Sequence, residues 1–156
     1  MTNNSNEKQN LTASSGLVKR KRARKNAMIL LFEADARKDE DRNELYRSEM
    51  ERITGEFDEE YTKAVYDGVM NHISEIDGII SEFANGWSTD RISKASRIIM
   101  RISLYEMLFA GGDGNEKIPP AVSINEAVEL TKRYDDEKMP GFVNGVLNNA
   151  SKKYVK

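Results

Sequence analysis

Apolar residues recur at every third or fourth position along most of this chain, which is the spacing of one buried face of an α-helix. The two clearest runs span Tyr61–Phe83 and Ile92–Phe109. No segment alternates apolar and polar residues for long enough to indicate a strand. The sequence therefore predicts an all-α fold whose core is built from several amphipathic helices.

Breaker and capping residues give the expected helix limits. Residues 1–16 are polar, carry no periodicity and predict a flexible tail, so 17–156 should form one helical domain. Helices are expected over 17–37, 58–85 with a break near Asp77 and Gly78, 90–110 with Asp90 as cap, 123–134 with a Ser123–Glu126 capping box, and 142–154. The helix over 90–110 is the most hydrophobic, which places Ile99 and Ile102 in the centre of the core.

Composition narrows the possible classes of protein. The chain has no cysteine, so a disulfide framework or a thiolate metal site is excluded. Its start lacks the apolar core of a signal peptide, and no segment approaches the roughly 20 apolar residues of a membrane span. A cytoplasmic protein without membrane contact is expected.

A dense basic segment stands out against a net charge of only −2. Six of the seven residues in 19–25 are basic, whereas 33–60 holds twelve acidic and five basic residues. Clustered Lys and Arg side chains neutralise phosphates, so the segment indicates nucleic-acid binding. A solvated helix face is the alternative interpretation.

Groups for catalysis are scarce in this sequence. His72 is the only histidine, so the sequence cannot supply a histidine metal cluster or a catalytic triad of the usual kind. We expect a structural role for His72. Neither nucleotide-binding glycine motif is present around Gly111–Gly114, which is interpreted as a linker, and the acidic run 135–137 is interpreted as a solvated loop. We therefore expect no enzyme activity, no metal and no cofactor.

Four motifs in order carry a resemblance to a known family. They are R-A-R-K-N-A at 22–27, R-I-S-L-Y-E at 101–106, I-N-E-A-V-E-L at 124–130 and F-V-N-G-V-L at 142–147. Together they resemble the NusB family of bacterial transcription antitermination factors over roughly Leu17 to Tyr154. The resemblance implies about seven helices arranged as two small bundles.

The same resemblance implies a binding function. NusB family proteins bind boxA-type single-stranded RNA of ribosomal RNA leader transcripts together with the ribosomal protein NusE. They act in the RNA polymerase antitermination complex with other Nus factors, so that terminators are read through and ribosomal RNA is made properly. Whether the free protein forms a homodimer is left open by the sequence.

Site residues follow from the family pattern together with the basic segment. The residues expected to contact RNA are Arg20, Lys21, Arg22, Arg24, Lys25 and Phe142. Those expected at the partner or RNA surface are Phe32, Ser96, Glu137 and Lys138. Two positions depart from the pattern: residues 138–140 replace an Asp-Ser type sequence, and Ser96 replaces a carboxylate.

Two other functions remain open. A similar helical domain serves as an accessory RNA-binding module in some ribosomal RNA methyltransferases, and the chain could also be a helical adaptor that binds only protein. Glu106 and Asn144, within or at the edge of apolar stripes, are expected to have structural roles.

Overall fold

The computed structural model describes residues 3–87 and 91–156, and these residues contain helices and no strand. The elements are α1 (Asn3–Ala36), α2 (Arg42–Met50), α3 (Glu59–Phe83), α4 (Lys94–Leu104), the π-helical turn η2 (Tyr105–Phe109), α5 (Pro120–Tyr134) and α6 (Met139–Tyr154). The predicted all-α fold is confirmed. None of the helices in this part of the chain is long and apolar enough to cross a membrane.

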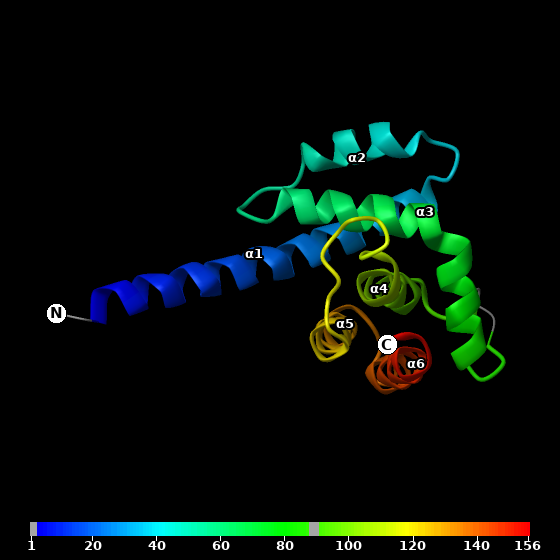
Figure 1. Ribbon diagram of the computed structural model, residues 1–156. Coiled ribbons are helices and arrows are strands. Elements are labelled where there is room, and N and C mark those ends of the chain that lie inside the picture. The colour runs from blue at the N-terminus through cyan, green and yellow to red at the C-terminus, as the bar shows by residue number, and fades with distance from the viewer. Residues whose placement is uncertain (1–2, 88–90) are drawn as a thin grey trace.

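The helices form two groups that share α3 (Figure 1). α1 packs against α2 and the first half of α3, and α4, α5 and α6 pack on one another beside the second half of α3. α1 also contacts α4, which joins the two groups. The outer turns of α1 extend beyond the other helices (Figure 1). Helix α1 thus begins within the segment 1–16, for which the sequence predicts a flexible tail; that expectation stays a prediction.

The bend in α3 lies at His72, where φ is −115° and ψ is 15°. The predicted break near Asp77 and Gly78 is therefore wrong. Gly78 lies inside α3 and is exposed, and one glycine weakens a helix only modestly and does not by itself end it. At the bend, the His72 ring stacks on Phe109 with 4.7 Å between ring centroids, and Nε2 lies 3.0 Å from Oδ2 of Asp113. The structural role expected for His72 is consistent with these contacts.

Helix α4 lies at the centre of the core. Ile99 and Ile102 are 1% and 2% exposed, which confirms their predicted positions. Arg101 on the same helix donates two hydrogen bonds of 2.8 Å to the carboxylate of Asp77 and so ties α4 to α3. Most residues of α4 are buried, and these include the polar Ser96, Arg101 and Ser103, so this helix is enclosed on most sides.

Two helix starts differ from those predicted. Ser93 caps α4, its hydroxyl accepting the Ser96 amide at 3.4 Å, whereas Asp90 lies outside the described residues. Helix α5 begins at Pro120, so the capping box at Ser123 is wrong. The fixed φ of proline suits the first turn of a helix and starts α5 three residues early. Ser123 is instead buried inside α5 and donates to Oε1 of Glu106 at 3.0 Å.

Candidate nucleic-acid interface

The basic segment lies on α1 and is held in place by contacts with α3 and with two loops. The Arg20 guanidinium stacks over the Tyr61 ring at 4.1 Å and donates to Glu116 at 3.1 Å. Arg22 donates to the backbone carbonyl of Glu56 at 3.1 Å. These contacts leave the charged groups at the surface, where they can reach a phosphate.

Arg24 differs from its neighbours because its side chain is only 4% exposed. Its Nε donates to Oε2 of Glu106 at 2.8 Å, and the hydroxyl of Tyr61 donates to the same oxygen. Burial raises the pKa of Glu106, while the Arg24 charge and the hydrogen bond from Ser123 act in the opposite direction. Arg24 therefore lies inside the fold and cannot contact an RNA bound at the surface, so its predicted role in RNA contact is wrong. Through these contacts Glu106 joins α1, α3, η2 and α5.

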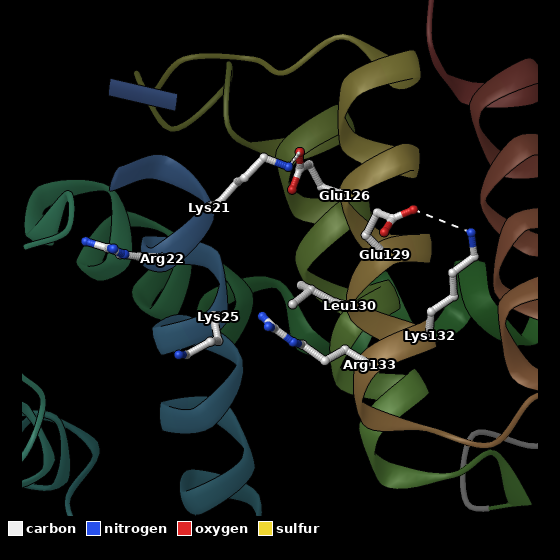
Figure 2. Close-up of a pocket in the computed structure, with 8 residues that line it drawn as sticks. All are labelled: Lys21, Arg22, Lys25, Glu126, Glu129, Leu130, Lys132 and Arg133. Atoms are coloured by element: carbon white, nitrogen blue, oxygen red, sulfur yellow. Dashed lines mark hydrogen bonds and ion pairs between the residues drawn. The ribbon is translucent and has the colours of Figure 1, made fainter. Parts of the chain in front are cut away.

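A groove of about 550 Å³ separates the basic face of α1 from α5 (Figure 2). Its lining residues are Lys21, Arg22, Lys25, Glu126, Glu129, Leu130, Lys132 and Arg133. Lys21 reaches across from α1, and its Nζ lies 2.7 Å from Oε1 of Glu126. The groove is open and strongly charged, as a site for a polyanionic strand requires.

An apolar hollow continues this surface along α1 and the end of α5, and α4 also contributes to its lining. It is lined by Met28, Ile29, Phe32, Glu33, Ala95 and Tyr134. Ile29 lies one turn after Lys25 on α1, and Tyr134 follows Arg133 on α5, so the charged groove and the hollow adjoin. Phe32 is 40% exposed, with the Lys94 ammonium 3.9 Å from its ring centroid. Exposed aromatic and aliphatic side chains together mark a surface that a protein or a base can cover.

Ser96 does not reach this surface because it is fully buried. Its hydroxyl donates to Oδ2 of Asp135 at 2.6 Å, and Ser93 donates to the same carboxylate. Burial alone would raise the pKa of Asp135, but the hydrogen bonds from Ser93 and Ser96 outweigh burial and lower it. Ser96 thus positions the loop between α5 and α6 and is not available for direct contact with a partner.

The remaining predicted residues lie on that loop and on the start of α6. Glu137 and Lys138 are exposed, and Phe142 is half-buried against the core in the first turn of α6. Asn144, for which a structural role was expected, is exposed, and its Oδ1 accepts a hydrogen bond from Asn148 at 2.9 Å. The basic segment and the predicted loop residues therefore come from opposite ends of the sequence.

No sequence pattern pointed to the α5 residues of the groove. Glu126, Lys132, Arg133 and Tyr134 are ordinary charged and aromatic residues of an amphipathic helix. Their spacing shows which residues share a face of α5, but it does not show that one of these faces lies opposite α1. No group of three or more side chains suited to a metal ion occurs among the described residues.

Sequence comparison places this arrangement among known proteins. The sequence model described as the NusB family matches residues 21–152. This chain belongs to the NusB family. The transcription antitermination protein NusB of Ruminiclostridium cellulolyticum is 40% identical over 134 residues, which cover 85% of this chain and 88% of that protein. The NusB protein of Clostridium botulinum is 41% identical over 138 residues, covering 87% of this chain and 100% of that protein.

Solved structures show the same NusB fold. The T. maritima NusB structure superposes with a TM-score of 0.74 at 31% identity, covering 87% of this chain and 92% of that one. A crystal structure of the antitermination factors NusB and NusE in complex with dsRNA gives a TM-score of 0.72 at 34% identity, covering 86% of this chain and 96% of that one. The resemblance drawn from the four motifs is confirmed.

Proposed function

We propose that this protein is a transcription antitermination factor that binds boxA-type single-stranded RNA of ribosomal RNA leader transcripts jointly with the ribosomal protein NusE. In this role it joins the RNA polymerase antitermination complex with other Nus factors in the cytoplasm. The protein contributes binding and positioning, with no chemistry of its own. A related NusB, crystallised with NusE and dsRNA, supports both kinds of partner.

One observation carries this proposal: a charged groove and an apolar hollow adjoin on the surface formed by α1 and α5. Arg20, Lys21 and Arg22 supply accessible cations beside or within the groove, which suits RNA phosphates. Ile29, Phe32 and Tyr134 are the exposed apolar side chains of the hollow, which suits a protein partner. The adjoining sites allow one surface to hold RNA and NusE together.

Some expected residues fit this proposal better than others. Lys25 and Phe32 lie on the groove or hollow, and Phe142, Glu137 and Lys138 follow the end of α5. Arg24 and Ser96 act through their buried partners and are left out of the contact surface. We assign RNA binding to residues 17–156 and treat 1–16 as a polar tail outside this domain.

A titration of boxA-like RNA with the full chain tests the function. Four accessible cations, namely Arg20, Lys21, Arg22 and Lys25, should give a log-log salt slope near −3, because each phosphate contact to a single strand contributes roughly −0.7. Adding NusE should tighten binding of the boxA-like RNA more than that of a scrambled RNA of equal length. Binding of NusE without any RNA binding would favour the protein-only adaptor and contradict the proposal. RNA binding that NusE leaves unchanged would favour the accessory module of an RNA methyltransferase.

A further inference from the structure

Arg133 is an exposed guanidinium in the last turn of α5, and no hydrogen bond or ion pair joins it to another of the described residues. Figure 2 shows its side chain reaching from α5 toward the basic face of α1. Its neighbour Lys132 points away from α1 and toward Glu129, with 3.5 Å between Nζ and Oε1. Two adjacent cations of one helix therefore have different surroundings.

The opposite wall of the groove carries the same sign of charge. Lys21, Arg22 and Lys25 line it from α1, and only Lys21 meets a carboxylate of the groove, that of Glu126. Arg133 thus extends toward a surface that already bears cations. Like charges brought together across a groove repel one another, and an anion between them removes that repulsion.

We infer that α5 forms the second wall of the RNA groove and that Arg133 binds a phosphate of the strand lying between α1 and α5. The inference rests on the proposed function. An arginine suits this position because its planar fork of N–H groups matches two phosphate oxygens at once. Arg133 contacts the RNA from the side opposite the basic segment, and this contact fixes the path of the RNA backbone through the groove.

The test compares Arg133→Gln with Lys152→Gln in the full chain. Each variant removes one positive charge from an exposed position in the last turn of a helix, so the net charge of the two proteins is equal, and Lys152 on α6 lines neither the groove nor the hollow. Binding of a boxA-like single-stranded RNA and of a scrambled RNA is measured over a range of salt concentrations. Far-ultraviolet circular dichroism of both variants verifies that the helices are retained.

Arg133→Gln should weaken binding about fivefold at about 0.1 M salt and flatten the log-log slope by roughly 0.7, the contribution of one phosphate contact. Because a phosphate contact carries no sequence information, the loss should be equal for both RNAs. Lys152→Gln should change the affinity less than twofold.

Two results overturn the inference and differ in what they leave standing. If the unmodified chain binds RNA and the two variants weaken binding equally, Arg133 contributes only to the overall electrostatic attraction between the protein and RNA. The inference then fails, and the proposed function survives. If the unmodified chain binds neither RNA at any salt concentration, the proposed function and the inference fail together.

Discussion

Nε of Arg24 lies 2.8 Å from Oε2 of Glu106, and this buried contact links the basic segment of α1 to the π-helical turn. The pair fixes the rotation of α1 about its own axis, because Arg24 must face inward to reach Glu106. Lys21, Arg22 and Lys25 then lie along the groove. One basic residue is thus used inside the fold, and this sets the direction in which the others point.

The first prediction concerns this pair. Glu106→Ala should lower the free energy of unfolding by about 3–5 kcal/mol, because it leaves the Arg24 charge buried without its partner. Urea denaturation followed by circular dichroism measures the change. Replacing both residues, Arg24→Met with Glu106→Leu, should recover much of the loss. A loss below about 1 kcal/mol in the single variant would show that Arg24 reaches water easily.

The second prediction concerns acid stability through Asp135. Its pKa is lower in the folded protein than its ordinary value of 3.8. Its contribution to stability is therefore present above that ordinary value and is lost as the pH falls through the folded pKa. Ser96→Ala removes one of the hydrogen bonds responsible and should destabilise the protein at neutral pH but much less in acid. Denaturation at several pH values measures the difference.

A matched control for Ser96→Ala is Ser151→Ala, since the Ser151 hydroxyl donates to the backbone carbonyl of Asn148 and touches no carboxylate. The effect of this control should be independent of pH. If Ser96→Ala also cost the same stability at every pH, the hydrogen bond to Asp135 would not be what lowers the pKa.

The third prediction concerns the close contact between α3 and η2. A Cβ atom at Gly68 would lie 2.1 Å from Cζ of Tyr105, whose buried ring is held by hydrogen bonds with Asp113 and Asn115. Gly68→Ala should therefore cost about 1–3 kcal/mol or more through overpacking. Gly78→Ala in the same helix has open space and should stabilise the protein by about 0.4–1 kcal/mol. The midpoint temperature of thermal unfolding should fall for Gly68→Ala and rise for Gly78→Ala. Equal shifts of the two midpoints would contradict the packing described.

The fourth prediction concerns Glu126, which binds Lys21 across the groove at 2.7 Å. A strand that uses Lys21 must break this ion pair. Glu126→Gln should tighten RNA binding about two- to fivefold, which corresponds to about 0.4–1 kcal/mol for a partly exposed pair. Glu129→Gln removes the same charge beside Lys132 and should have a smaller effect. Unchanged or weaker RNA binding by Glu126→Gln would show that Lys21 is not used.

Much of the fold follows from the sequence because helix periodicity and burial are local properties. The pattern in 90–110 placed Ile99 and Ile102 in the core, and the structure buries both. The bend in α3 did not follow, because it depends on Phe109 and Asp113, which lie far along the chain from His72. The start of α5 was missed because Ser123–Glu126 was interpreted as a capping box, although Pro120 also suits the first turn of a helix.

By itself the sequence determined the helical class, the place of the core and the presence of a basic segment on the first helix. Only the tertiary structure decided which of those basic side chains face solvent. Arg24 and Arg22 are indistinguishable as charges in a sequence, yet one is buried against Glu106 and the other lines the groove. The physical reason is that a charge acquires its role from the groups brought beside it. Helix packing brought Glu106 to Arg24 and placed α5, with Arg133, across the groove from α1.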